Sequence, residues 1–192
     1  MPLDRRAAVS RLLADRGDAL VVTGLGSPTY DVHAHGDHDG NFYLWGAMGG
    51  AALVGYGLAH AQPDRRVIVI TGDGEQLMAL GGLATIASAP PANLDVVVLD
   101  NEQYGETGMQ TSHTGLGIDL AAVAIAVGFT DSRTITTDDE LERFVAGRAG
   151  AAGGLRFAVV KIRQENLPRS MPSRDAVFVK NRFRAHLGLE PN

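Results

Sequence analysis

The 192-residue sequence contains no cysteine. A disulfide framework, a thiolate zinc site, an iron–sulfur cluster and a cysteine nucleophile are therefore excluded, and any metal must be held by oxygen or nitrogen. No apolar run approaches the roughly 20 residues that span a bilayer, and the N-terminal residues do not have the pattern of a signal peptide. We therefore expect a cytoplasmic protein that does not enter a membrane.

Positive charge is also scarce, since 17 Lys and Arg face 22 Asp and Glu and leave a formal net charge of −5. Aromatic residues make up only 6% of the chain. Both values disfavour binding to nucleic acid, which uses overall basicity and aromatic platforms. The bases are nevertheless concentrated in a basic C-terminal extension at about 163–192, which is either a solvated helix face or a site for an anionic substrate or an acidic partner.

Apolar runs alternate with helical patterns along the chain. Strands are predicted at 19–23, 66–71, 94–99, about 130–135 and 157–162. Helices are predicted at 3–16, 46–61, 76–88, 119–127, 138–149 and, capped by Ser173, at 173–186, with a flexible loop at 150–154. Strands that are apolar on both faces and separated by helices are typical of a parallel sheet covered on both sides. We expect residues 1–192 to form a single domain of the doubly wound α/β class, with a mostly parallel sheet.

The strand predicted at 66–71 runs directly into the triplet Gly72-Asp73-Gly74. Ligands of α/β proteins bind outside the carboxyl ends of parallel strands, and the free N–H groups of a following helix suit a phosphate. An Asp beside a phosphate is repulsive unless a cation lies between them. Asp73 therefore indicates a bound magnesium or calcium ion that bridges carboxylate and phosphate oxygens.

The next predicted strand, 94–99, ends at Asp100-Asn101 and continues into a loop that contains Gln103. Adjacent parallel strands would bring Asp73 and Asn101 to the same edge of the sheet. The interval of 26 residues between Gly74 and Asn101 is the length of one helix and one strand, so the spacing has a structural cause. The two loops together provide the several oxygen ligands that a hard divalent cation needs.

This pair of motifs resembles the diphosphate-binding domain of thiamine diphosphate enzymes. The resemblance implies the thiamine diphosphate-binding fold, with thiamine diphosphate and Mg²⁺ as cofactors. The metal ligands that it implies are Asp73, the side-chain oxygen of Asn101 and the backbone carbonyl of Gln103. The family usually has two asparagines in a row where this chain has Asp100-Asn101, and the second of the two is the ligand.

The same resemblance implies residues that contact the cofactor. They are Gly24, Gly26 and Ser27 after the first strand, Gly46 and Met48 in the stretch 44–50, and Gly72, Gly74, Glu75, Asn101 and Tyr104 around the metal. Met48 is expected to wedge under the cofactor and bend it, although a methionine on a helix of small residues is also typical core filler. The turn at 24–28 fails as a dinucleotide fingerprint because its third glycine position holds Thr29.

The segments 41–43, 77–81 and 104–108 narrow the resemblance further. They are similar to the β subunit of sulfopyruvate decarboxylases and to the C-terminal part of phosphonopyruvate decarboxylases, and the similarity covers about 24–162. This implies non-oxidative loss of CO₂ from a small anionic 2-oxo acid. If the substrate carries a second acidic group, Arg169 and Arg174 are candidates for the countercharge.

In the family, a Glu from a pyrimidine-binding domain activates the cofactor, and no segment of this chain matches that domain. The resemblance therefore implies a separate partner subunit that supplies this Glu, together with self-association as a dimer or higher oligomer. Two alternatives stay open. The chain could be a carboligase subunit of the acetolactate synthase type, or a noncatalytic subunit that binds cofactor and regulates a partner.

Proton transfer is assigned to three candidate residues, Glu106, His113 and His35. Glu106 and His113 follow the metal loop, where family members often place groups that face the substrate; surface or capping roles are the alternative. His35 belongs to a loop with His33 and His38, whose spacing does not aim the three rings at one metal. A solvated loop and an active-site proton donor are the two interpretations of this segment.

Overall fold

The apolar segments of the chain form one six-stranded sheet in the computed structural model, which describes residues 2–149 and 154–190. The strand order is β2-β1-β3-β4-β8-β7, and every pairing in this sheet is parallel. The strands are β1 (Leu20–Thr23), β2 (Asn41–Tyr43), β3 (Val67–Gly72), β4 (Asn93–Asp100), β7 (Asp131–Ile135) and β8 (Gly154–Lys161). The chain moves from β1 outward to β2 and then returns to the other side of β1 at β3, so β1 and β3 flank a switch point where α/β proteins bind ligands.

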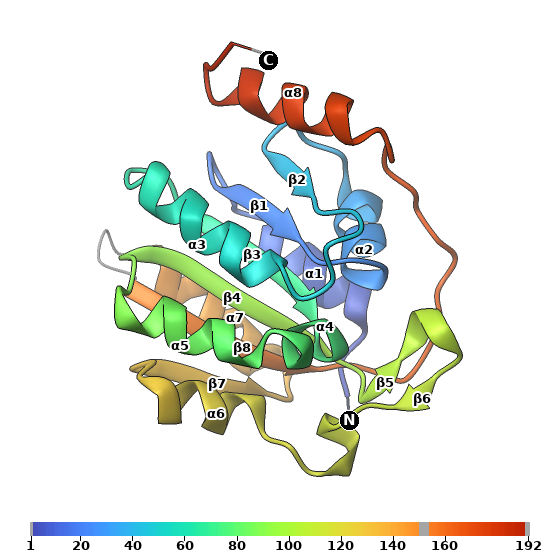
Figure 1. Cartoon of the computed structure of the whole chain (residues 1–192). Coiled ribbons are helices and arrows are strands. Elements are labelled where there is room, and N and C mark those ends of the chain that lie inside the picture. Colours follow the sequence, from blue (N-terminus) through green and yellow to red (C-terminus); the bar gives the residue numbers. More distant parts are fainter. Residues whose placement is uncertain (1, 150–153, 191–192) are drawn as a thin grey trace.

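Helices cover both faces of this sheet (Figure 1). Those of the described residues are α1 (Arg5–Leu13), α2 (Ser27–His35), α3 (Ala51–Ala61), α4 (Asp73–Met78), α5 (Leu80–Ser88), α6 (Leu120–Val127), α7 (Asp138–Ala146) and α8 (Ala176–His186). One apolar cluster packs α1, α2 and α7 on one face, and a second packs α3, α5 and α6 on the other. The doubly wound α/β prediction is therefore confirmed.

Neighbouring residues of each strand enter opposite cores, as the two-residue period of a strand requires. In β3, Val67 and Val69 pack against α3 and α5, whereas Ile68 and Ile70 pack against α1 and α2. All four side chains are fully buried. This burial on both faces explains why the strand reads as a continuous apolar run.

Several boundaries differ from the sequence-based prediction. The helix predicted at 76–88 is two helices, because α4 begins at Asp73, directly after β3, and α5 begins at Leu80. The helix predicted at 46–61 begins only at Ala51. Asp175, not Ser173, caps α8, since its side chain accepts from the N–H groups of the first turn. The loop predicted at 150–154 falls mostly outside the described residues.

The sequence-based prediction has no helix directly after Gly26. In the structure, α2 begins at Ser27 with Pro28 in its first turn, a position that suits proline because its missing N–H is not needed there. The histidine loop prediction was wrong for the same reason, since His33 and His35 lie in the last turn of α2. Strand β2 has only three residues, too few for a periodic pattern.

Beyond β8 the chain continues as an extended segment, the C-terminal strap (residues 163–175), that leads to α8. Figure 1 shows this strap running along the outside of the domain, past the hairpin of β5 (Gln103–Tyr104) and β6 (Gln110–Thr111). Helix α8 then packs on β2, where the rings of Phe42 and Phe183 meet edge to face at 5.4 Å. None of the helices in the described ranges is long and apolar enough to cross a membrane.

Candidate cofactor and metal site

A cleft lies outside the carboxyl ends of β1, β3 and β4, beside the switch point of the sheet. The predicted site residues that line it are Ser27, Met48, Gly72, Asp73, Gly74, Glu75, Asn101, Gln103, Tyr104 and Glu106. These residues come from four separate segments of the chain, which only the fold brings together.

Asp73 is the first residue of α4, and only 2% of its surface is exposed. Its Oδ2 accepts hydrogen bonds from the hydroxyl groups of Ser112 and Thr114, the latter at 3.1 Å. Burial raises the pKa of Asp73 to about 6, and the charge of nearby Asp100 adds to the shift, although the Ser112 hydrogen bond opposes it. A buried carboxylate with a carboxylate neighbour gains most from a cation that binds beside it.

Asp100, which stands where the family usually has asparagine, faces a base. Lys161 Nζ lies 2.9 Å from Asp100 Oδ2 and 2.6 Å from Glu102 Oε1. Asp100 and Lys161 are register partners on β4 and β8, so the pairing follows from the sheet. Lys161 thus neutralises the extra carboxylate, and among the described residues Asp73 has no ion pair of its own.

The loop after β4 turns sharply into the cleft. Asn101 Oδ1 accepts from the N–H of Gln103 at 3.1 Å, and Glu102 takes a left-handed φ of 61°. Asn101 and Gln103 line the cleft together with Asp73. The described residues contain no cluster of three His, Cys, Asp or Glu side chains that could hold a metal, so the candidate donors are one carboxylate, one amide oxygen and one backbone carbonyl. Mg²⁺ accepts such a set, because it prefers oxygen, uses one or two carboxylates and fills its other positions with water or phosphate.

Gly74 allows the ring of Tyr104 to pack against the backbone of α4. A Cβ atom at this position would lie 2.6 Å from two carbons of that ring, which is closer than real contacts permit. The Tyr104 hydroxyl lies 3.1 Å from His113 Nδ1. His113 is therefore connected to the cleft through Tyr104, and it does not line the cleft itself.

The carboxylate of Glu75 joins two loops beneath the cleft. It is buried and accepts from the N–H of Leu25 at 2.8 Å and from that of Gly49 at 3.2 Å. Burial raises the pKa of Glu75, against these hydrogen bonds. Gly24 leaves room for this carboxylate, since a Cβ there would lie 1.9 Å from Glu75 Oε2. Glu75 therefore holds the loop after β1 to the loop before α3.

Comparison with known proteins identifies the family of the chain. Residues 26–161 match the family described as thiamine pyrophosphate enzyme, C-terminal TPP binding domain. The chain belongs to this family. Thiamine diphosphate (thiamine pyrophosphate) with Mg²⁺ is accordingly the cofactor of the domain, and the buried Asp73 with the oxygen donors of Asn101 and Gln103 fits the metal.

Two curated relatives show how far the similarity extends. The chain is 39% identical over 183 residues to sulfopyruvate decarboxylase subunit beta of Methanothermobacter thermautotrophicus, and the match covers 95% of each chain. It is also 39% identical over 189 residues to phosphonopyruvate decarboxylase of Streptomyces viridochromogenes, and there it covers 97% of this chain but 47% of the relative. The chain thus spans about half the length of the second relative.

Solved structures share the fold. Benzoylformate decarboxylase from Polynucleobacter necessarius superposes with a TM-score of 0.71 at 23% identity, covering 88% of this chain and 34% of that one. The thiamine diphosphate-dependent 4-hydroxybenzoylformate decarboxylase of Rhodococcus jostii gives the same TM-score at 20% identity. At such identities the likeness supports the thiamine diphosphate-binding fold alone.

Met48 and Gly46 lie in the loop before α3, outside any helix. Met48 lines the cleft and is 41% exposed, so it is not the core filler that a small-residue helix would bury. Gly46 has a φ of 73°, which glycine adopts without strain. Both placements are compatible with the thiamine diphosphate contacts predicted for these residues.

Glu106 is the candidate proton-transfer residue that lines the cleft directly. It lies against Gly26, where a Cβ would approach its Cγ to 2.8 Å, and Gly26 itself has a φ of 76°. The Glu106 carboxylate pairs with Arg169 of the C-terminal strap at 2.9 Å. Glu106 is therefore held at the mouth of the cleft by a residue 63 positions away.

His35 does not line the cleft. Its Nδ1 lies 3.2 Å from the hydroxyl of Ser10 on α1, so its position gives no support to the predicted proton transfer. His33 instead lies 2.8 Å from the hydroxyl of Ser170 in the strap.

Sequence reasoning missed a buried ion pair in the cleft wall. Arg5 Nε lies 3.0 Å from Asp31 Oδ2, and Arg5 Nη1 donates to the hydroxyl of Ser27 at 3.1 Å. Arg5, Asp31 and Ser27 all line the cleft. No local pattern marks Arg5, which reads as one polar residue of an amphipathic helix. By contrast, Lys161 could have been found as the base next to the end of the strand predicted at 157–162.

Proposed function

We propose that the chain is the thiamine diphosphate- and Mg²⁺-binding subunit of a two-subunit decarboxylase. Its substrate would be a small 2-oxo acid with a second acidic group, such as sulfopyruvate or phosphonopyruvate. One observation carries the proposal: Asp73, buried and without an ion pair among the described residues, lines one cleft with Asn101 and Gln103. The chain that builds this cleft matches a sulfopyruvate decarboxylase β subunit over 95% of both lengths.

The roles of the chain's own residues follow from their places. Bound thiamine diphosphate supplies an electron sink for the electrons left when a 2-oxo acid loses CO₂. Asp73, the Asn101 side chain and the Gln103 carbonyl would hold Mg²⁺, and Met48 would support the cofactor from the loop before α3. Ser112 and Thr114 orient Asp73 through the hydrogen bonds that they donate.

The activating Glu would come from a partner subunit with a pyrimidine-binding domain. Among the described residues two glutamates line the cleft, and both are engaged: Glu75 accepts from backbone N–H groups, and Glu106 pairs with Arg169. The matched relatives support a division between chains, because one is a β subunit of equal length and another is about twice as long. Self-association of this subunit as a dimer or higher oligomer is part of the same proposal.

The test uses the complex isolated from its source cells through a tag on this chain. Calorimetric titration with thiamine diphosphate should show Mg²⁺-dependent binding that Asp73→Ala weakens by at least about 100-fold, since even outer-shell partners of a metal cost 10–100-fold. Asp64→Ala is the matched control, because Asp64 is exposed in the turn before the same strand, at its opposite end. Unchanged affinity in Asp73→Ala would refute the metal site.

Product analysis separates the proposed function from its alternatives. Supplying sulfopyruvate or phosphonopyruvate to the loaded complex should release CO₂ and leave the corresponding aldehyde. A product with a longer carbon skeleton would indicate a carboligase. Cofactor binding with neither product would indicate a noncatalytic regulatory subunit.

A further inference from the structure

The C-terminal strap (residues 163–175) is fastened beside the mouth of the cleft. The backbone carbonyl of Glu165 accepts a hydrogen bond from Arg5, and that of Pro168 accepts one from Arg6. The carbonyl of Ser173 accepts from the Trp45 indole at 2.9 Å. The hydroxyl of Ser170 lies 2.8 Å from His33 Nδ1. Contacts to α1, α2 and the loop before α3 therefore hold the strap along its length, and the side chains that it carries have defined places.

Arg169 is the strap residue whose side chain pairs with a cleft-lining carboxylate, although Arg169 does not itself line the cleft. Its Nη2 lies 2.9 Å from Oε2 of Glu106, which lines the cleft, and its guanidinium lies over the ring of Tyr30 at 5.6 Å. The Arg169 side chain is 60% exposed. The ring and the carboxylate fix where the guanidinium lies, while its exposure leaves it open to a ligand.

The other bases near the cleft are also in ion pairs, but they are less exposed than Arg169. Arg5 and Arg6 pair with Asp31, and Lys161 pairs with Asp100 and Glu102; the three basic side chains are 2%, 33% and 29% exposed. Arg174 comes close enough to lower the pKa of Tyr30, though burial and Glu106 raise that pKa on balance. Among the described residues, Arg169 is thus the base that combines contact with a cleft-lining side chain and an exposed guanidinium.

We propose that Arg169 binds the second acidic group of the substrate and so sets the preference for 2-oxo acids that carry a sulfonate or phosphonate; this rests on the proposed function. A guanidinium has five N–H donors in a rigid fork that matches oxyanions. Nη2 of Arg169 is bound to Glu106, and the remaining N–H groups can donate hydrogen bonds to a second oxyanion. A 2-oxo acid without the second acidic group leaves these donors in water and gains nothing from them.

The experiment compares two substrates in the isolated complex. Sulfopyruvate carries the second anion, and 2-oxobutyrate, of similar size, does not; the latter is measured as a substrate or as a competitive inhibitor. Charge-assisted hydrogen bonds are the strong ones, so Arg169→Gln should raise the KM for sulfopyruvate roughly 10- to 100-fold and leave cofactor affinity and the 2-oxobutyrate constant nearly unchanged. Arg169→Lys should be intermediate, because it keeps the charge and loses the fork.

Arg163→Gln is the matched control, since Arg163 is an exposed strap arginine that pairs with Asp4 and Glu165 and does not line the cleft. It should change neither constant. An unchanged sulfopyruvate KM in Arg169→Gln, or equal losses for both compounds, would overturn the assignment and leave the proposed function standing. A wild-type complex that binds thiamine diphosphate and releases no CO₂ from sulfopyruvate or phosphonopyruvate would refute the proposed function and this assignment with it.

Discussion

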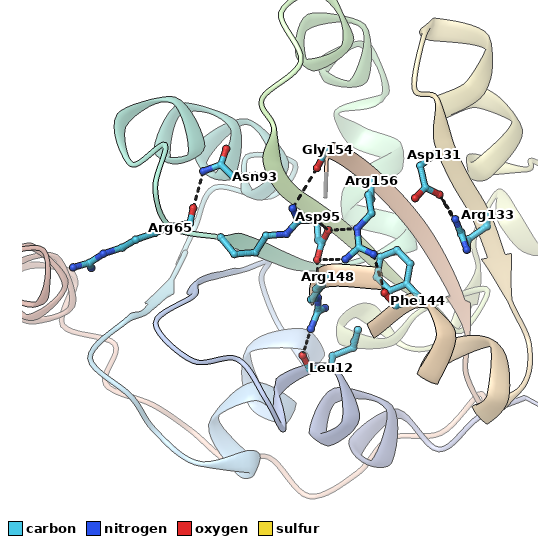
Figure 2. Close-up of polar contacts among 11 residues, drawn as sticks. Leu12, Arg65, Asn93, Asp95, Asp131, Arg133, Phe144, Arg148, Gly154 and Arg156 are labelled. Carbon is cyan, nitrogen blue, oxygen red and sulfur yellow. Dashed lines mark hydrogen bonds and ion pairs between the residues drawn. The ribbon is translucent and has the colours of Figure 1, made fainter. Parts of the chain in front are cut away.

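Replacing Asp95 with asparagine tests whether one buried carboxylate stabilises the amino-terminal end of the strands, opposite the cleft. Asp95 lies on β4, is fully buried, and accepts from Arg156 Nε at 2.7 Å and Nη2 at 2.8 Å. Arg148 Nε donates at 2.7 Å, and Arg66 completes the set. Figure 2 shows Arg148 and Arg156 beside this side chain. The guanidinium of Arg156 also lies over the ring of Phe144, 4.3 Å from its centroid.

The magnitude follows from what Asp95→Asn leaves behind. Asparagine keeps the shape and one acceptor oxygen, but three guanidiniums that are at most 15% exposed lose their counter-charge. Breaking a buried pair by removing one partner costs about 3–5 kcal/mol, which is a large part of a typical stability of about 5–15 kcal/mol. We expect the free energy of unfolding to fall by that amount.

Asp131→Asn is the matched control. Asp131 pairs with Arg133 on the edge strand β7, where both side chains are partly exposed (Figure 2). Exposed pairs contribute only about 0–1 kcal/mol. The two substitutions make the same chemical change, so the difference between them isolates the effect of burial.

The pH dependence of the free energy of unfolding gives a second test of the role of Asp95. Burial by itself would raise the pKa of Asp95, but the Arg156 hydrogen bonds and the charges of Arg148 and Arg66 outweigh it and hold the pKa below the ordinary value of 3.8. Because the folded-state pKa is lowered, the stability that Asp95 contributes is fully present above pH 3.8 and is lost as the pH falls from there through the folded-state value. Asp95→Asn should therefore flatten the acid side of the stability curve.

Urea unfolding followed by circular dichroism measures both effects on the isolated chain. The midpoint of Asp95→Asn at pH 7 should drop well below those of wild type and Asp131→Asn, and its stability should vary less with pH below 3.8. If the two variants lose equal stability, the charge on Asp95 is not what holds the three arginines, and the reasoning is refuted.

Three glycine substitutions follow from the space around each residue. Gly57→Ala, on the exposed side of α3 with no atom near the new Cβ, should stabilise the fold by about 0.5–1 kcal/mol. Gly55→Ala, where the Cβ would lie 2.1 Å from a Val69 methyl group, should instead lower the stability of the fold by about 1–3 kcal/mol. Thermal unfolding measures both variants, and equal shifts in their melting temperatures would contradict the packing of α3. Gly24→Ala should displace the Glu75 carboxylate and weaken thiamine diphosphate binding in calorimetry, whereas full affinity would show that this carboxylate does not hold the two loops.

Tertiary contacts explain where sequence reasoning about the site stopped. The Asp73 hydroxyl partners Ser112 and Thr114 lie 39 and 41 residues away, and the Lys161 that neutralises Asp100 lies 61 residues away. No local period marks such residues, because what brings each pair together is the packing of strands and loops. The catalytic candidates show the same limit: Glu106 reaches the cleft, but His35, a similar guess from the sequence, contacts α1 instead.

The sequence by itself determined that the sheet is parallel, the places of five of its six strands and the loops that carry Asp73 and Asn101. Those features depend on short-range patterns, namely apolar strands, helical spacing and a ligand interval as long as one helix and one strand. Only the tertiary structure decided that α2 begins at Ser27, that Lys161 faces Asp100 and that the C-terminal strap brings Arg169 to Glu106. These three features depend on contacts between side chains at the ends of strands and along an extended segment. The periodicity of the sequence does not indicate which residue such a side chain will contact.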